Sequence, residues 1–209
     1  RWRMRNEVLV EPVLETPLDV PGIGAFNSRL YRAHDGGLHL AVWKGSISGD
    51  PPVLARIQAA IPVIDVFGSG GVSDSNLQLE LALRQIESAG RGVLLYLHVS
   101  GSYTVDETLA QIREHLGLAD QDGSSAGSGP GALRELGVGA QILVNMGARR
   151  LKLMTNNPRK LMGLEGFGLE VVERVPLQVP VSEKNAAFLQ NRRLQLGHLI
   201  PDPNVKAGT

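Results

Sequence analysis

An almost uninterrupted apolar run from Gly92 to Val99 constrains the fold of this chain more than any other feature. A strand whose residues do not alternate between apolar and polar is covered on both faces, which is typical of a parallel sheet between helices. From residue 53 onward, strand-like and helix-like segments alternate around this run. The sequence therefore predicts an α/β fold with a mixed or parallel sheet flanked by helices.

Apolar periodicity and turn residues place the other elements. Strand patterns over residues 25–31 and 38–43 flank an Asp-Gly-Gly turn at 35–37, which predicts an N-terminal β-hairpin. The alternating part is expected to contain strands at 53–57, 92–99, 151–154 and 169–175, and helices at 74–89, 104–118, 133–146, 159–162 and 188–199.

Composition divides the chain into segments. Three prolines interrupt residues 1–22, which we interpret as a lead-in linker to a domain over residues 23–200. Residues 120–131 are rich in glycine and serine and are expected to form a flexible loop, either a plain connection or an active-site lid. Residues 201–209 are expected to form a tail.

The overall composition excludes several classes of protein. Lys and Arg number 21 and Asp and Glu number 21, so a zero net charge argues against nucleic-acid and polybasic membrane partners. No apolar run reaches the ~18–20 residues of a membrane span. The absence of cysteine excludes disulfides, thiolate zinc sites and cysteine nucleophiles. With neither an initiator methionine nor an apolar leader at its start, the chain is expected to be a piece of a longer cytoplasmic protein.

Candidate ligand sites lie where the predicted strands end, because ligands of open α/β sheets bind beyond the carboxyl ends of the strands. The candidate edges are a glycine-rich turn at residues 65–71 and the segments 99–104 and 155–160. At the last of these, a threonine hydroxyl, two asparagine amides and two basic side chains favour an anionic or purine-like ligand. An Asn-Pro turn that caps a helix is the alternative interpretation.

A longer pattern carries a resemblance to a known family. Its segments are Leu136–Leu143, Leu153–Lys160, Gly163–Leu177, Asp65–Ser69 and Gly90–Tyr96. They closely resemble GTP cyclohydrolase II, which opens the purine ring of GTP in riboflavin biosynthesis, and the similarity covers about residues 25–200. The first residues resemble the linker of fused proteins in which a dihydroxybutanone phosphate synthase domain precedes the cyclohydrolase domain. The resemblance therefore implies a GTP cyclohydrolase II-like fold, a fused or partner synthase domain and a homodimer.

The resemblance also implies a metal site that this sequence does not retain. In the family, three cysteines hold a zinc ion whose bound water attacks the purine. The matching positions here are Ile61, Ser73 and Ser75. An isoleucine offers no donor atom and neutral serine hydroxyls bind zinc poorly. We therefore expect no zinc and no other cofactor.

Other positions of the family's pattern are changed as well. The loop that handles phosphate reads Ser100-Gly101-Ser102, the general-base aspartate is Ala132, and His115 lies near a tyrosine position. The retained positions are Arg56, Gln78, Thr155 and Lys160, which the resemblance assigns to nucleotide binding, and Arg134, which it assigns to a relic of the catalytic nucleophile. Each of these residues is either a relic of the family's site or a residue that still contacts a ligand.

These observations favour a GTP cyclohydrolase II-like domain that has lost the zinc site and the ring-opening activity. Such a domain would act as a structural or regulatory module for a dihydroxybutanone phosphate synthase domain. Two alternatives remain open. The domain is a sensor that binds GTP or another purine or phosphate ligand, or it retains a zinc-independent phosphate-transfer or pyrophosphate-releasing activity through Arg134.

Overall fold

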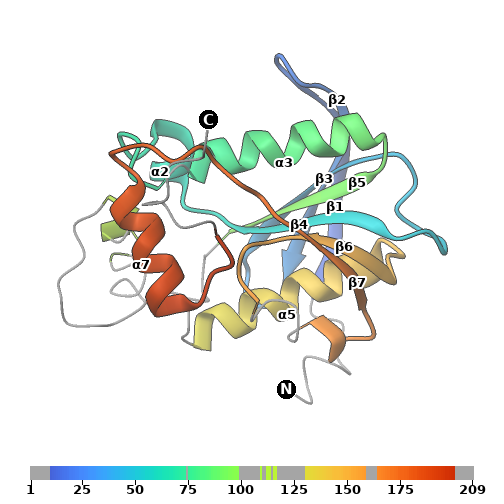
Figure 1. The fold of residues 1–209 in the computed structure, drawn as a ribbon. Coiled ribbons are helices and arrows are strands. Elements are labelled where there is room, and N and C mark those ends of the chain that lie inside the picture. The colour runs from blue at the N-terminus through green and yellow to red at the C-terminus, as the bar shows by residue number, and fades with distance from the viewer. Residues whose placement is uncertain are drawn as a thin grey trace.

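A seven-stranded mixed sheet forms the centre of the molecule in a computed structural model (Figure 1). The structure describes residues 10–73, 75–98, 109, 112–113, 115–116, 130–158 and 164–200, with only the backbone described at 130–134, 195 and 196. The strands are β1 (Val10–Val20), β2 (Gly24–Ala33), β3 (Leu38–Lys44), β4 (Val53–Ala59), β5 (Gly92–Leu97), β6 (Arg150–Met154) and β7 (Glu170–Val175).

The spatial order of the strands is β1-β2-β3-β5-β4-β6-β7. The pairs β1–β2, β2–β3 and β3–β5 are antiparallel, whereas β5–β4, β4–β6 and β6–β7 are parallel. The sheet therefore has an antiparallel half built from the N-terminal strands and a parallel half. The predicted α/β class and the predicted hairpin at β2–β3 are confirmed.

Helices cover both faces of the sheet. Helix α3 (Ser75–Ala89) lies on one face and α5 (Pro130–Asn145) on the other (Figure 1). Helices α2 (Pro62–Phe67) and α7 (Ala186–Leu196) lie at the end of the sheet where β4 finishes. Two apolar clusters result, one between α5 and the sheet and one between α3 and the sheet. Among the helices that the structure describes, none has the length and apolar character needed to span a bilayer.

Strand β5 is the element from which the fold was predicted, and it is buried on both faces. Val93, Leu95 and Leu97 pack in the α5 cluster, and Leu94 packs in the α3 cluster. At its start, a Cβ on Gly92 would lie 2.8 Å from the carbonyl oxygen of Leu54, so only glycine fits there without displacing the neighbouring strand. The apolar run was thus correctly interpreted as a strand between two layers of helix.

The first strand differs from the prediction for residues 1–22. Residues 10–20 form β1, which pairs with β2 from Val10↔Ala33 to Val20↔Gly24, so the predicted boundary at residue 23 falls inside a hairpin. Because β1 is an edge strand, a proline within it costs no ladder bond when its nitrogen faces outward. The expectation of a linker over residues 1–22 is therefore wrong for residues 10–20.

Smaller differences concern the helices. Residues 62–67 form a short helix that begins with Pro62, a residue favoured at the first helical position, so the predicted turn at 65–71 starts later. Helix α5 begins at residue 130, inside the predicted loop 120–131. Several predicted segments lie outside the described residues. These are residues 120–129, the whole predicted helix at 159–162, most of the predicted helix at 104–118 and the tail 201–209.

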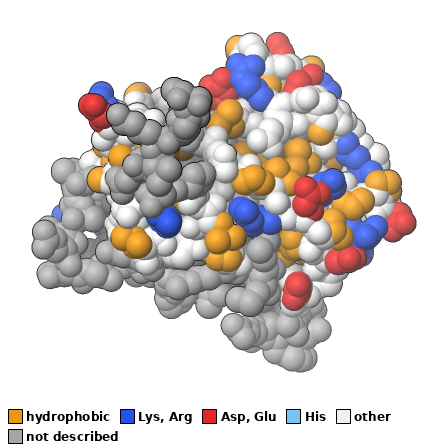
Figure 2. All heavy atoms as spheres, viewed as in Figure 1, with side chains coloured by type: hydrophobic (Ala, Val, Ile, Leu, Met, Phe, Trp, Pro, Cys, Tyr) orange, Lys and Arg blue, Asp and Glu red, His pale blue; other side chains and the backbone are white. Residues whose placement is uncertain are grey.

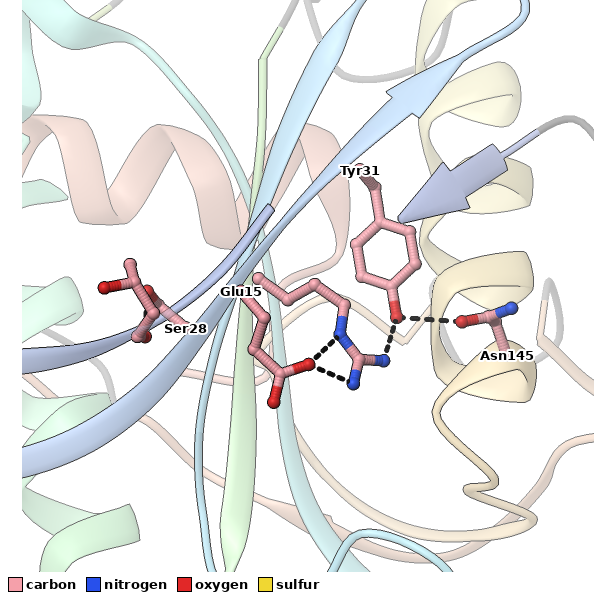
Figure 3. A network of polar contacts seen from close by, with 6 residues as sticks. Glu15, Ser28, Tyr31 and Asn145 are labelled. Atoms are coloured by element: carbon pink, nitrogen blue, oxygen red, sulfur yellow. Dashed lines mark hydrogen bonds and ion pairs between the residues drawn. The ribbon is translucent and has the colours of Figure 1, made fainter. Parts of the chain in front are cut away.

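A polar network ties the β1–β2 hairpin to α5 (Figure 3). The Arg29 guanidinium donates to the Glu15 carboxylate, with Nε at 2.8 Å, and to the Tyr31 hydroxyl at 3.1 Å. The Tyr31 hydroxyl donates to Asn145 Oδ1 at 2.9 Å. Arg29 also lies 5.3 Å from the ring centroid of Trp43. These contacts hold the antiparallel half against the end of α5.

Charged side chains of both signs are intermixed on the face seen in Figure 2. Two ion pairs join the neighbouring strands β6 and β7. Arg150 lies 3.1 Å from Glu170, and Lys152 lies 2.8 Å from Glu173. These pairs are exposed, so each contributes little to the free energy of unfolding.

Candidate functional site

Arg56 lies in the middle of β4 and is only 8% exposed. Its Nε and Nη2 atoms donate to Gln58 Oε1, Nη2 also donates to Gln78 Oε1 at 3.1 Å, and Nη1 donates to the Met154 carbonyl at 3.0 Å. Residues 56 and 58 share one face of the strand because side chains alternate. The structure therefore brings Arg56 and Gln78, two predicted nucleotide-binding residues, into direct contact.

The acceptors that hold Arg56 are all neutral. Burial lowers the pKa of Arg56 to about 10, and the negative charges of Glu135 and Asp65 partly offset that effect. At neutral pH the guanidinium is still charged. Its positive charge is stabilised by amide and carbonyl dipoles between the middle of β4 and the carboxyl end of β6.

A second set of hydrogen bonds continues from Gln58. Gln58 Nε2 donates to Ser75 Oγ at 3.2 Å, and the Ser75 hydroxyl donates to Asp65 Oδ1 at 2.7 Å. The Tyr96 hydroxyl donates to Asp65 Oδ2 at 2.7 Å. Burial, together with this hydrogen bond to Asp65, raises the pKa of Tyr96 above its ordinary value. One carboxylate thus joins α2, α3 and β5.

The two other positions matched to zinc ligands also contact the chain itself. The Ile61 backbone N–H donates to Asp65 Oδ2 at 2.8 Å, and its apolar side chain is buried. Ser73 is buried, and its hydroxyl donates to Ser69 Oγ at 3.2 Å. All three positions are therefore part of the packed interior of this edge.

The residues present do not fit a zinc site. The Ser75 hydroxyl already donates one hydrogen bond and accepts another, Ser73 is bonded to a serine, and Ile61 has no donor atom. Within the described part of the chain, no group of three or more His, Cys, Asp or Glu side chains could hold a metal ion. Zinc prefers thiolates, imidazoles and carboxylates, and neutral hydroxyls do not replace them.

Thr155 lies at the same edge, directly after β6, and is 2% exposed. Its Oγ1 accepts the Asn157 backbone N–H at 3.0 Å. The Asn156 side chain donates to the Leu177 carbonyl at 2.8 Å and accepts the Leu177 N–H at 3.2 Å. At residues 155–157 these polar groups therefore bond within the chain, whereas the helix that an Asn-Pro turn would cap lies outside the described residues.

The remaining predicted residues are placed only in part. Lys160 and the segment 100–102 lie outside the described residues. Ala132 and Arg134 lie in α5, where the structure describes the backbone alone. His115 packs beside α7, with its ring centroid 5.6 Å from that of Phe188.

Sequence reasoning did not single out Gln58 and Tyr96. Gln58 follows Arg56 by two positions in a strand, a spacing that places both side chains on one face. Tyr96 is the one side chain with a hydroxyl in the apolar run 92–97. A buried tyrosine hydroxyl requires a partner, so both residues carried a signal of a polar cluster.

Taken together, the topology and the polar carboxyl edge define an α/β domain with a mixed seven-stranded sheet. Residues 11–176 match the family model described as GTP cyclohydrolase II, and the chain belongs to this family. The resemblance inferred from the sequence is thereby confirmed.

Several relatives are proteins named riboflavin biosynthesis protein RibBA. The one from Bacillus cytotoxicus is 40% identical over 202 residues, which cover 95% of this chain and 50% of the relative. The one from Bacillus mycoides is 41% identical over 202 residues with the same coverage. The chain therefore spans about half the length of the curated relatives it matches.

A solved structure shares the fold. The crystal structure of RibBX from A. baumannii, described as a two domain 3,4-dihydroxy-2-butanone 4-phosphate synthase, matches with a TM-score of 0.54 and 23% identity. The match covers 85% of this chain and 43% of that chain. At this identity the similarity supports the fold alone.

Proposed function

We propose that this chain is a GTP cyclohydrolase II-like domain that binds no zinc and opens no purine ring, and that it serves a 3,4-dihydroxy-2-butanone 4-phosphate synthase domain as a structural or regulatory module. One observation carries the proposal. The Ser75 hydroxyl, at a position matched to a zinc ligand, is bonded to both Asp65 and Gln58.

The chemistry of the family explains why this matters. Ring opening needs a water molecule made nucleophilic near neutral pH, which the family obtains from zinc. Here the three matched positions supply one alkyl side chain and two hydroxyls that already have partners. The base position is Ala132, which has no group to accept a proton. The site therefore lacks both the metal ligands and the base.

The proposed partner follows from the relatives. The RibBA proteins are twice as long as the matched segment, and the solved RibBX structure is described as a two-domain synthase. A half that keeps its fold but lacks the reaction can still contribute surface and stability to the other half. This supports a module whose role is to hold or regulate the synthase.

The buried hydrogen bonds favour this role over that of a nucleotide sensor. Arg56 donates four hydrogen bonds, to Gln58, Gln78 and the Met154 carbonyl, and Thr155 Oγ1 accepts one from the Asn157 N–H. A nucleotide at this edge would have to replace those bonds, and each replaced bond reduces the net affinity. The alternative through Arg134 rests on the sequence alone.

Two titrations of the 209-residue chain test the proposal. In competition with a chromogenic chelator, zinc is expected to remain with the chelator, whereas a GTP cyclohydrolase II that retains its cysteines takes up one zinc per chain. Calorimetric titration with GTP and GDP is expected to give no heat of binding. Stoichiometric zinc uptake contradicts the proposal, and saturable GTP heat without zinc supports the sensor instead.

A further inference from the structure

Helix α2 presents an outward face that is entirely apolar. Val63 is 50% exposed, Val66 71% and Phe67 84%, and Pro62 beside them is also exposed. We call Pro62, Val63, Val66 and Phe67 the α2 apolar face. A helix on the surface of a protein normally directs charged or polar side chains outward, so an outward face made only of apolar residues marks an interaction surface.

Helix α2 is anchored to the fold through its inward side chains, Ile64 and Asp65. Ile64 is fully buried, and the Asp65 carboxylate accepts hydrogen bonds from Ser75, Tyr96 and the Ile61 backbone N–H. Every remaining side chain of the helix therefore points away from the core. Because α2 is anchored in this way, Phe67 stays exposed and is preorganised for a partner.

The described chain begins and ends at the same end of the strands as α2, which is the end where β4 finishes. Val10 pairs with Ala33 at the β2–β3 turn, and β3 begins there, where His39 pairs with Leu97 at the end of β5. The end of β5 in turn pairs with the end of β4, and α2 follows β4 after two residues.

The C-terminal end of the described chain returns to the same end of the strands. The Leu199 backbone N–H donates to the Asn156 carbonyl, two residues beyond the end of β6. Because β6 is parallel to β4, its carboxyl end lies on the side of the sheet where α2 begins. Both ends of the described chain therefore lie at the same end of the strands as α2.

The dimensions allow a further domain joined at either end to reach the α2 apolar face. Strand β1 is separated from β4 by four strand spacings, or about 19 Å. The unmatched half of the relatives is about as long as this chain. A domain of roughly 200 residues has a radius of gyration of about 16 Å, so it covers that distance without an extended linker.

We infer that the α2 apolar face is the docking surface for the 3,4-dihydroxy-2-butanone 4-phosphate synthase domain, an inference that rests on the proposed function. The partner surface is expected to be apolar at its centre, because the face itself offers no charge and no hydrogen-bonding side chain. Asp65 contributes indirectly by fixing the helix that presents the face.

Hydroxyl-radical footprinting measures whether a side chain is covered. Phe67 is to be compared in the isolated 209-residue chain and in the full-length polypeptide that carries the synthase domain. Docking is expected to slow oxidation of Phe67 by at least about fivefold, because interface cores exclude water as protein interiors do. Leu14, which is 55% exposed on β1, serves as the control and is expected to react equally in both proteins.

A charge placed in the surface provides the second arm. In the full-length polypeptide, Val66→Asp is expected to restore the fast oxidation of Phe67 because it buries an unpaired carboxylate in the interface. Leu14→Asp is the matched variant and is expected to leave Phe67 protected. Both side chains are exposed in the folded domain, so each substitution is expected to leave the fold intact.

The outcomes separate the possibilities. Equal oxidation of Phe67 in both proteins overturns the inference. Protection that already appears in the isolated chain and increases with its concentration shows a second copy on this face, which also overturns it. Protection of Phe67 in a full-length protein that lacks synthase activity or opens the ring of GTP supports the docking surface and rejects the proposed function.

Discussion

Two polar networks stabilise opposite parts of this sheet, and they differ in charge and burial. In the antiparallel half, the pair between Glu15, 53% exposed, and Arg29, 25% exposed, is an ion pair at the surface. At the carboxyl edge of the parallel half, Arg56 is buried among neutral acceptors, and Asp65 accepts three hydrogen bonds from neutral donors.

On the proposed function, this difference explains how the chain keeps the family fold without zinc. A metal ion joins several segments through strong bonds to charged ligands, and a half-buried carboxylate with several donors also joins several segments. Here Asp65 connects α2 to Ser75 at the start of α3 and to Tyr96 on β5. The pair between Glu15 and Arg29 contributes less, because solvent competes for both partners, and in that network the buried Tyr31 hydroxyl makes the bond that reaches α5.

The largest expected effect is that of removing the half-buried Asp65 carboxylate. Asp65→Ala leaves Ser75, Tyr96 and the Ile61 N–H without their acceptor. Because hydrogen bonds to charged groups contribute more than neutral ones, we expect a loss of about 3 kcal/mol in the free energy of unfolding. Urea denaturation followed by circular dichroism measures this loss.

Tyr96→Phe is the graded control for that variant. It removes one of the three donors to Asp65 and keeps the ring, so a loss of about 1 kcal/mol is expected. If Asp65→Ala were no more destabilising than this single deletion, the carboxylate would not be the centre of the buried network.

The second effect concerns His39, a buried polar group that belongs to neither network. Within the described residues, neither ring nitrogen of His39 has a hydrogen-bond partner, and the side chain is 4% exposed between Tyr31 and Leu97. His39→Leu removes two unsatisfied polar atoms and is expected to raise the free energy of unfolding by about 1 kcal/mol. A loss of stability instead would show that the ring has a partner.

The same residue gives the antiparallel half a pH dependence. Burial lowers the pKa of His39 below its ordinary value of 6.5, with Asp35 opposing and His98 reinforcing that change. Between the lowered value and 6.5, the unfolded chain binds more protons than the folded one, so stability falls as the pH drops below 6.5 and is fully regained above it. Denaturation midpoints measured from pH 5 to 8 should show this slope, and His39→Leu should reduce it.

The smallest effect is expected at the surface network. Glu15→Ala removes the ion pair with Arg29, and because both side chains are partly solvated the expected loss is about 0.5 kcal/mol. Glu11→Ala, which breaks the similar pair with Arg32, is the matched control. If Glu15→Ala alone lowered the free energy of unfolding by more than about 2 kcal/mol, the surface network would stabilise the fold as much as the network around Asp65, which contradicts the proposed difference.

The parts of the fold that follow from local pattern were predictable. The apolar run at β5 fixed a strand covered on both faces, and the turn at 35–37 fixed the hairpin β2–β3. Strand β1 was missed because its prolines disfavour strands in general and are tolerated only at an edge. The position of a strand at the edge of a sheet is a property of the whole topology, which local pattern does not contain.

The candidate site was predictable to a different degree. The family resemblance singled out Arg56 and Gln78, and in the structure Arg56 Nη2 donates a hydrogen bond to Gln78 Oε1 at 3.1 Å. The contact between Asp65 and Tyr96 joins residues 31 positions apart through tertiary packing, so neither propensity nor periodicity indicates it. The nucleotide-binding role assigned to Arg56, Gln78, Thr155 and Lys160 stays a prediction.

The most direct test of the central claim is a ring-opening assay. The purified chain is incubated with GTP, Mg²⁺ and Zn²⁺, and the ring-opened pyrimidine product is measured beside a GTP cyclohydrolase II that retains its three cysteines. We predict that this chain yields no product above the uncatalysed background, because Ile61, Ser73 and Ser75 supply no zinc ligands. Product formation at an enzymatic rate would contradict the account.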